Sequence, residues 1–311
     1  MKILVTGGAG FIGSSLVDRL LAGGHAVDVI DDLSNGSLAN LASARSRGGA
    51  GHQLSFHQLD IRSPDLGELM ARRRPELVFH LAAVAPPGGP VVDADATVVG
   101  SVQLLEGCRA ANARKVVFAA AASIYGDLDR SQLPARESEP RRPLSSEGLS
   151  KAAVLDYLYA YRERFDLEFT ALVLANVYGP RGHDGVVAGF ARRLLSGEAC
   201  TIFGDGRQTR DFVYVDDVVD AFARSIERGD GLMINIGTGA ETSVRDLYAT
   251  MAAAAGVDRP AVFAPGRRGR GEPTRMAVDI GRAAIHLGWK PWTGLPEGAR
   301  SVLAATRQAT H

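Results

Sequence analysis

The first thirteen residues constrain the fold most strongly, because they join an apolar strand to a glycine-rich turn and a helix start. Residues 3–6 read Ile-Leu-Val-Thr, and an amphipathic helical pattern follows the turn. Between these two patterns lie Gly7, Gly10 and Gly13. Glycines at this spacing permit a tight turn and bring backbone N–H groups close to a pyrophosphate at the helix start. The segment therefore predicts a βαβ unit that binds a dinucleotide.

The end of the next strand indicates which dinucleotide is bound. The strand expected over Ala26–Ile30 leads into Asp31 and Asp32, and the next basic residue is Arg45. A carboxylate at Asp31 can accept hydrogen bonds from both hydroxyls of the adenosine ribose. The second carboxylate would repel a 2′-phosphate, and no cation nearby would attract one. The predicted cofactor is therefore NAD rather than NADP.

Composition excludes several classes of partner. Lys plus Arg and Asp plus Glu both number 35, so the overall charge favours neither a nucleic acid nor a membrane surface. No apolar run approaches the roughly 18 residues of a membrane span, and the first residues already form a functional strand. We therefore expect a cytoplasmic protein without a leader. Cys108 and Cys200 lack metal-ligand spacing, so we expect neither a disulfide nor a zinc site.

Strand-like and helix-like segments alternate along the chain. This alternation predicts an α/β fold, a Rossmann-type doubly wound parallel sheet with right-handed crossovers and a smaller, interleaved C-terminal substrate lobe. We expect residues 1–175 to form the NAD-binding domain, with 211–236 returning to it, and 176–210 and 237–311 to form the substrate lobe. The expected strands are Lys2–Thr6, Ala26–Ile30, Leu54–Gln58, Leu77–Leu81, Lys115–Ala119, Phe169–Leu174, Phe212–Val215 and Met233–Ile236. The expected helices are Val98–Ala111, Leu149–Phe165, Val186–Leu195, Asp216–Glu227 and Val244–Ala255.

A series of short motifs in one order along the chain carries a family resemblance. They are residues 6–13 (TGGAGFIG), 31–36 (DDLSNG), 60–62 (DIR), 80–83 (HLAA), 124–126 (IYG), 150–151 (SK), 176–181 (NVYGPR), 204–212 (GDGRQTRDF), 235–238 (NIGT) and 287–289 (LGW). Together they resemble the extended short-chain dehydrogenase/reductases, and within that family the nucleotide-sugar 4-epimerases of the UDP-glucose 4-epimerase type and the dehydratases. The resemblance runs nearly from end to end.

The resemblance implies a set of cofactor contacts. Lys151 would hold the nicotinamide ribose, and its ammonium would lower the pKa of a neighbouring acid. Asp60 and Ile61 would contact the adenine. The full set of expected NAD-binding residues is Gly7, Gly10, Phe11, Ile12, Gly13, Asp31, Asp32, Asn35, Gly36, Asp60, Ile61, Leu81, Ala82, Ala83 and Lys151.

The resemblance also implies contacts with the substrate, a UDP- or dTDP-linked sugar. Asn176 and Arg210 match positions that grip the nucleotide diphosphate in relatives, and a guanidinium offers a planar fork of donors to phosphate oxygens. A second diphosphate-binding arginine is expected in a late loop, but its slot falls on Gly269. Arg268 or Arg270 takes its place in our prediction, with Arg267 beside them.

The catalytic residues depart from the family pattern. The family carries a Tyr-x-x-x-Lys motif whose tyrosinate takes a proton from the sugar hydroxyl, but here Glu147 stands in the tyrosine slot before Lys151. The helper Ser or Thr falls on Ala121, and Ser123 is the nearest hydroxyl. The Asp-Glu pair of the 4,6-dehydratases is replaced by Ala122 and Ser123. The candidate catalytic residues are therefore Glu147, Lys151 and Ser123.

A glutamate is a much weaker base than a tyrosinate. The ordinary pKa values of the two side chains differ by about six units, on the order of 8 kcal/mol in basicity, although neighbouring cations narrow that gap. Three interpretations follow. The chain is a nucleotide-sugar 4-epimerase with Glu147, Ser123 or a water as acid/base. Alternatively, it is a dehydratase, a decarboxylase or a nucleoside-directed oxidoreductase with a carboxylate base. It could also be a binding relative with little turnover.

Two expectations concern assembly and specificity. The long helices Val98–Ala111 and Leu149–Phe165 resemble those that pair into a four-helix dimer interface, with Tyr157 and Tyr161 spaced to share a face. A homodimer is therefore expected. The loops at 84–95 and 176–200 would shape the sugar pocket, and the sequence does not name the sugar or the base.

Overall fold

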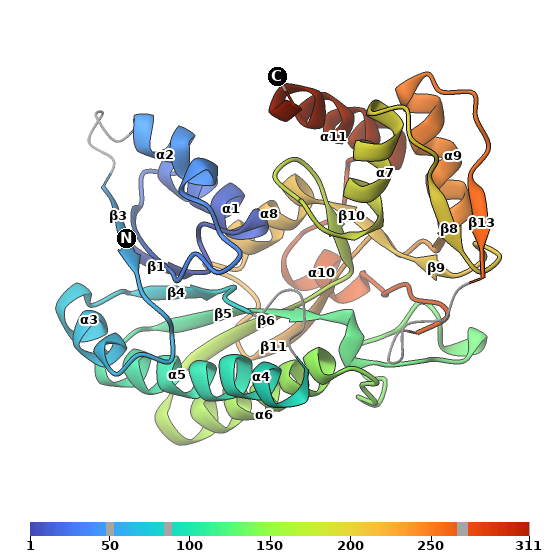
Figure 1. Ribbon diagram of the computed structural model, residues 1–311. Coiled ribbons are helices and arrows are strands. Elements are labelled where there is room, and N and C mark those ends of the chain that lie inside the picture. Colours follow the sequence, from blue (N-terminus) through green and yellow to red (C-terminus); the bar gives the residue numbers. More distant parts are fainter. Residues whose placement is uncertain (48–52, 84–88, 266–272, 311) are drawn as a thin grey trace.

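A seven-stranded parallel sheet forms the centre of the computed structural model, which describes residues 1–47, 53–83, 89–265 and 273–310 (Figure 1). The strand order is β11-β6-β5-β4-β1-β2-β3. All six neighbouring pairs run parallel. The strands are β1 (Lys2–Thr6), β2 (Ala26–Asp31), β3 (Leu54–Gln58), β4 (Leu77–His80), β5 (Lys115–Ala121), β6 (Glu168–Leu174) and β11 (Leu232–Ile236). The predicted Rossmann-type α/β fold is confirmed.

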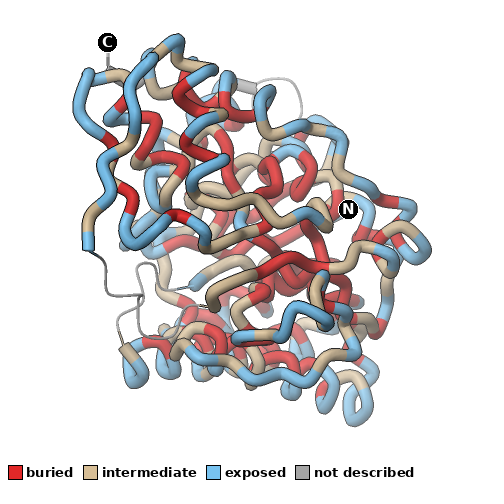
Figure 2. The backbone as a smooth tube through the Cα atoms, turned by 90° about the vertical axis from the view of Figure 1, so that its right-hand side faces the viewer, coloured by how far each residue is buried: buried red, intermediate tan, exposed pale blue. Residues whose placement is uncertain are grey.

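Helices cover both faces of this sheet, so the strands are almost continuously apolar (Figure 1). One face carries α1 (Phe11–Ala22), α2 (Ala42–Arg47) and α8 (Val215–Arg224). The other carries α3 (Asp65–Arg73), α4 (Pro90–Asp93), α5 (Gly100–Ala110) and α6 (Ser146–Phe165). Buried residues follow the sheet and the inner sides of the helices, while exposed residues lie outside (Figure 2). No described helix is both long and apolar enough to cross a membrane.

A smaller second lobe packs beside the carboxyl end of the sheet (Figure 1). Its helices are α7 (Gly185–Leu195), α9 (Val244–Ala255) and α11 (Leu295–Thr310). Its short strand pairs are β7 (Asn176–Tyr178) with β10 (Phe212–Tyr214), β8 (Thr201–Phe203) with β13 (Val262–Ala264), and β9 (Thr209–Arg210) with β12 (Thr242–Ser243). The short helix α10 (Gly281–His286) comes between β13 and α11 in the chain and packs against β11.

The observed bounds of several elements differ by a few residues from the expected ones, and two of these differences have a clear local cause. Helix α6 begins at Ser146 rather than Leu149, because the Ser145 hydroxyl accepts a hydrogen bond from the Gly148 N–H at 3.1 Å and caps the helix. The helix expected over Val98–Ala111 is a composite, in which a π-helical turn (η3, Ala94–Val99) leads into α5. Side-chain periodicity does not distinguish a π-turn from an α-turn at this length, so sequence alone could not place that junction.

A buried carboxylate fixes the junction between the sheet and the second lobe. Asp211 accepts hydrogen bonds from the Thr238 N–H at 2.8 Å, the Thr238 hydroxyl at 2.6 Å and the Gly239 N–H at 3.1 Å. The Val278 N–H donates to the same carboxylate at 3.3 Å. Burial raises the pKa of Asp211, and these donors act in the opposite direction. Asp211 thereby sets the position of Arg210, the residue before it.

Candidate functional site

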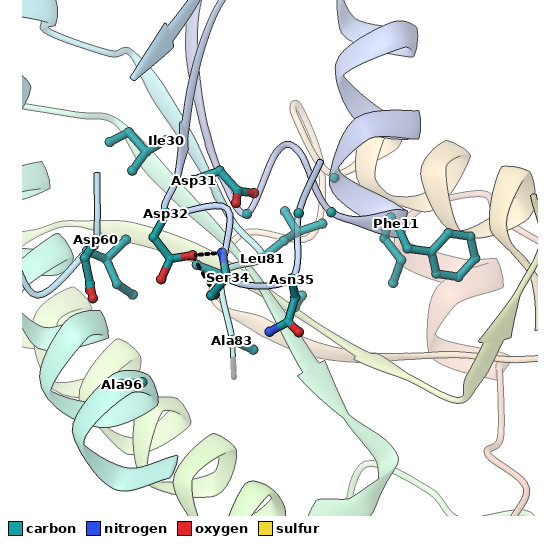
Figure 3. Close-up of a pocket in the computed structure, with 18 of the residues that line it drawn as sticks. Phe11, Ile30, Asp31, Asp32, Ser34, Asn35, Asp60, Leu81, Ala83 and Ala96 are labelled. Atoms are coloured by element: carbon teal, nitrogen blue, oxygen red, sulfur yellow. Dashed lines mark hydrogen bonds between the residues drawn. The ribbon is translucent and has the colours of Figure 1, made fainter. Parts of the chain in front are cut away.

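A cavity of about 500 Å³ opens where the strand order reverses, at the carboxyl ends of β1, β2 and β4. This is the place where doubly wound sheets bind their ligands. Of the predicted cofactor residues, every one except Lys151 lines the cavity, and Figure 3 shows several of them around it. The remaining lining residues are Ile30, Ser34, Asn40, Leu59, Arg62, Val92, Ala96, Ala119, Arg181, His183 and Asp184.

The glycine turn closes one side of this cavity. Gly7 has a φ of +68°, and a Cβ there would lie 2.7 Å from the Ala82 nitrogen. A Cβ on Gly13 would lie 2.1 Å from the Gly7 carbonyl oxygen. Neither position can accept a side chain without moving backbone. The two glycines therefore hold the start of α1 against the end of β1, which points unpaired N–H groups of the helix at the cavity.

Asp31 stands at the end of β2 with only 7% of its surface exposed. Its Oδ2 accepts a hydrogen bond from the Ala9 N–H at 2.9 Å, and its Oδ1 accepts one from the Leu33 N–H at 2.9 Å. Burial raises the pKa of Asp31, and the two backbone donors oppose that shift. A carboxylate has about four acceptor sites, so further hydrogen bonds from ribose hydroxyls fit this group.

Asp32 organises the loop beside Asp31. Its Oδ1 accepts hydrogen bonds from the Ser34 N–H at 2.9 Å and the Ser34 hydroxyl at 2.6 Å, as the dashed lines in Figure 3 show. Two carboxylates therefore line the cavity side by side. Their charge disfavours a phosphate at this place.

Arg62 also lines the cavity, and its charge is neutralised by two carboxylates. Its Nη2 donates to Asp60 at 2.6 Å and its Nη1 donates to Asp95 at 2.6 Å. The Arg62 side chain lowers the pKa of Asp60. Sequence reasoning missed Arg62 as a cavity residue, although it belongs to the DIR motif. Because two carboxylates occupy its donors, it does not supply the free cation that a 2′-phosphate would require.

Lys151 does not line the cavity but contacts one of its lining residues. Its side chain is buried, its Nζ donates to the Ala119 carbonyl at 2.8 Å, and it lies 4.7 Å from the centre of the Phe118 ring. Ala119 itself lines the cavity. Burial lowers the pKa of Lys151 to about 8, while the charge of Glu147 acts in the opposite direction. Lys151, the residue predicted to hold the nicotinamide ribose, therefore contacts a residue of the cavity wall but does not itself line the cavity.

A chain of hydrogen bonds fixes the tautomer of His80. The Ser101 hydroxyl donates its only proton to the Thr97 carbonyl, so His80 Nε2 donates to Ser101 Oγ at 2.8 Å. In a neutral ring, His80 Nδ1 then accepts from the Thr6 hydroxyl at 2.7 Å. The Thr6 oxygen accepts in turn from the Ala82 N–H at 3.2 Å. The chain runs from the π-helical turn to the cavity wall with every proton assigned.

The candidate acid/base residues meet at the start of α6. Glu147 lies in the first turn of the helix, partly exposed and one turn before Lys151. A Cβ on the next residue, Gly148, would lie 2.7 Å from the Ser123 carbonyl oxygen, so the helix start packs closely on the turn Ala122–Ile124. The Ser123 Oγ is buried and has no hydrogen-bond partner among the described residues. A buried hydroxyl without a partner is costly, which is typical of groups that await a ligand.

The predicted diphosphate ligands Asn176 and Arg210 lie on two separate strand pairs of the second lobe, Asn176 on β7 and Arg210 on β9. The Asn176 N–H donates to the Asp211 carbonyl at 2.8 Å, and Asn176 pairs with Phe212 across β7 and β10. Arg210 donates from Nη1 to the Thr209 carbonyl at 2.9 Å. Neither Asn176 nor Arg210 lines the cavity at the ends of β1, β2 and β4. Arg267, Arg268 and Arg270 lie outside the described residues, as does part of the loop at 84–95.

Arg181 is a second cavity residue that sequence reasoning missed. It has a φ of +67° and donates to the Ser14 hydroxyl at 3.2 Å and to Asp18 Oδ2 at 2.8 Å. These contacts tie the loop after β7 to the first helix. The NVYGPR motif contains this arginine, but only the fold brings it against α1.

Comparisons with known proteins agree on one family. The family model described as "NAD dependent epimerase/dehydratase family" matches residues 3–237. The UDP-glucose 4-epimerase of Mycolicibacterium smegmatis is 45% identical over 308 residues, which cover 96% of each chain. The Thermotoga maritima UDP-glucose 4-epimerase, solved with UDP-glucose, superposes with a TM-score of 0.93 at 37% identity and covers 100% of both chains. The Thermus thermophilus UDP-glucose 4-epimerase, solved with NAD, gives a TM-score of 0.90 at 35% identity, covering 99% of this chain and 100% of that one.

The first prediction concerns the pH dependence of stability at His80. Burial, assisted by the Lys151 charge, lowers the pKa of His80 to about 3 from 6.5. Between those values the unfolded chain binds one more proton than the folded one, so stability falls as the pH is lowered through this window. His80→Gln should reduce the slope by up to about 1.4 kcal/mol per pH unit. Urea unfolding from about pH 7 to about pH 4 measures this change.

The matched control is His286→Gln, the same substitution at an exposed histidine of α10. It should leave the slope as in the parent protein. An unchanged slope in His80→Gln would show that His80 is not held neutral by its burial.

Proposed function

This chain belongs to the NAD dependent epimerase/dehydratase family, and we propose that it is a nucleotide-sugar 4-epimerase that uses NAD and takes UDP-hexoses. The observation that carries the proposal is the full-length match to UDP-glucose 4-epimerases in both sequence and structure. The UDP moiety is inferred from those relatives. The reaction inverts one carbon of the sugar and leaves no net redox change.

The described cavity fits NAD. Its glycine turn holds the start of α1 close against the end of β1, Asp31 retains acceptor capacity for ribose hydroxyls, and the charge of Arg62 is neutralised by Asp60 and Asp95. When bound, NAD⁺ would accept the hydride from the sugar carbon and later return that hydride to the same carbon. The residues expected to hold NAD are those of the glycine turn, Asp31, Asp60 and Lys151.

Glu147 is the acid/base in this proposal. It stands in the slot of the family tyrosine, one helical turn from Lys151, and its charge raises the pKa of that lysine against the effect of burial. A glutamate side chain is shorter than a tyrosine, so an intermediate hydroxyl is needed to reach the sugar. The unpartnered Ser123 Oγ supports that role, because its proton and lone pairs are uncommitted among the described residues. Glu147 thus accepts the sugar hydroxyl proton through Ser123 or a water.

Replacing the carboxylate by an amide tests this role. Glu147→Gln keeps the shape of the side chain but cannot accept a proton, so kcat for UDP-glucose and UDP-galactose should fall by about 10²-fold or more. Bound NAD and affinity for UDP should stay as in the parent protein. Coupled assays and isothermal titration measure these quantities.

Glu163→Gln is the matched control, because it makes the same change on an exposed residue of the same helix. It should keep the parental kcat. Full activity in Glu147→Gln would show that Glu147 is not the base.

Restoring the family pattern provides an independent test. Glu147→Tyr together with Ala121→Ser returns both expected catalytic side chains to the ends of α6 and β5. A tyrosinate is the stronger base and reaches further, so turnover of UDP-hexoses should rise about tenfold or more over the parent protein. The two single variants serve as controls and should gain less. No gain in the double variant would argue against a conventional substrate geometry.

A homodimer completes the proposal. Leu149 and Tyr157 on α6 are 58% and 41% exposed, and Val99 at the start of α5 is 47% exposed. These apolar side chains lie on the outer side of the two long helices, where a second copy would cover them. Tyr161, which was expected to share this face, is instead buried and donates to Glu106 of α5 at 2.5 Å.

Disruption of this face should produce monomers. Tyr157→Asp places a charge in the proposed interface, where an unpaired carboxylate is costly to bury, so the dimer should dissociate at micromolar concentration. Ile285→Asp, at a 79% exposed position of α10, should remain dimeric. Sedimentation velocity measures the mass, and a parent protein that sediments as a monomer would contradict the assignment.

A further inference from the structure

Asp93 is a buried carboxylate for which neither the motifs nor the cavity gives a role. It ends α4 and has only 2% of its surface exposed. Its Oδ2 accepts a hydrogen bond from the hydroxyl of Ser146, the first residue of α6. The next residue is Glu147. A carboxylate is costly to bury, so its pairing with this particular serine calls for an explanation.

The hydrogen bond between Asp93 and Ser146 is not needed to form the helix. The Ser145 hydroxyl already caps α6 by accepting the Gly148 N–H. Ser146 follows the cap, and its hydroxyl donates its only proton to Asp93 rather than to the backbone of its own helix. The Ser146 hydroxyl therefore serves a connection between segments rather than a local one.

The segment that holds Asp93 also forms one wall of the cofactor cavity. Val92, in α4, and Ala96, in the π-helical turn, both line the cavity, and Figure 3 shows Ala96 at the edge of that space. Helix α6 packs against both α4 and the π-helical turn (Figure 1). Residues 90–99 therefore contact the cofactor space with one side and the start of the catalytic helix with the other.

The same segment is anchored at two further points. Arg62 joins Asp60, two residues after the end of β3, to Asp95. The Thr97 carbonyl accepts the Ser101 hydroxyl, which is the last link of the His80 chain. Arg62 lines the cavity, and the His80 chain ends at Ala82, which also lines it. Because residues 90–99 are fixed to the cavity wall in this way, their position relative to the cavity also determines the position of the start of α6, which packs on their other side.

We infer that Asp93 is a positioning residue, which acts through Ser146 to set the Glu147 carboxylate relative to the cofactor cavity. The inference rests on the proposed role of Glu147 as acid/base. Asp93 holds the first turn of α6, and therefore Glu147, in register with Val92 and Ala96. The hydrogen bond thereby couples the placement of the base to the wall that contacts the cofactor.

The test removes the hydroxyl and retains the charge. Ser146→Ala leaves Asp93 and the Ser145 cap in place but breaks the link to Glu147. The value of kcat should fall about tenfold, with KM for UDP-glucose and NAD content within about twofold of the parent values. Ser146→Thr restores a hydroxyl and should recover most of kcat. Asp93→Asn keeps an acceptor oxygen and should fall between these two variants. Ser131→Ala, at an exposed turn, should behave as the parent protein.

A double-mutant cycle separates positioning from general structural support. In the Glu147→Gln background, Ser146→Ala should cause no further loss of the residual rate, which is measured at high enzyme concentration. The same tenfold loss in that background would overturn the inference, because the effect would not pass through Glu147. Parental kcat in Ser146→Ala would also overturn it. Failure of the proposed function has a different result, namely full activity in Glu147→Gln alone.

Discussion

The close approach of the glycine turn to the end of β4 is the contact on which the rest of the site depends. At Gly7 the backbone leaves no room for a Cβ beside Ala82, and at Gly13 it leaves none beside the Gly7 carbonyl. These approaches join β1, α1 and the β4 loop into one rigid corner at the reversal of strand order. Because only backbone fits at this corner, no side chain covers the start of α1. The N–H groups at the helix start are therefore exposed to an anionic ligand in the cavity.

Electrostatics then narrow the identity of that ligand. The cavity presents the carboxylates of Asp31 and Asp32 at one place, and at another an arginine, Arg62, that already binds two carboxylates. Such a surface can accept hydrogen bonds from ribose hydroxyls but offers no uncommitted cation from these groups to a 2′-phosphate. Burial also limits the positive charge near Lys151. It lowers the pKa of His80, so His80 stays neutral and adds no second positive charge beside the lysine.

The parts of the site that sequence predicts well are those encoded within one short segment. The glycine turn, Asp31 and the strand Lys2–Thr6 follow from local pattern, because turn geometry and strand alternation are local constraints. The hydrogen bond between Asp93 and Ser146 joins residues 53 positions apart, and the bond between Arg181 and Asp18 joins residues 163 apart. Such pairs arise only when the sheet brings distant loops together. Motif spacing identified Arg181 as part of a motif, yet its partner on α1 depended on the fold.

The proposed use of Glu147 in place of the family tyrosine is best understood through the neighbours of Glu147 rather than through its intrinsic basicity. Lys151 is buried enough that its pKa falls to about 8, and the charge of the adjacent Glu147 carboxylate stabilises the protonated lysine. A glutamate therefore serves this pair electrostatically even though it is the weaker base. Its shorter reach is the remaining difficulty, and the unpartnered Ser123 hydroxyl lies beside the helix start where a relay is needed. A relay requires all three groups to keep a fixed spacing, which gives the tie between Asp93 and Ser146 a function that a directly acting tyrosine would need far less.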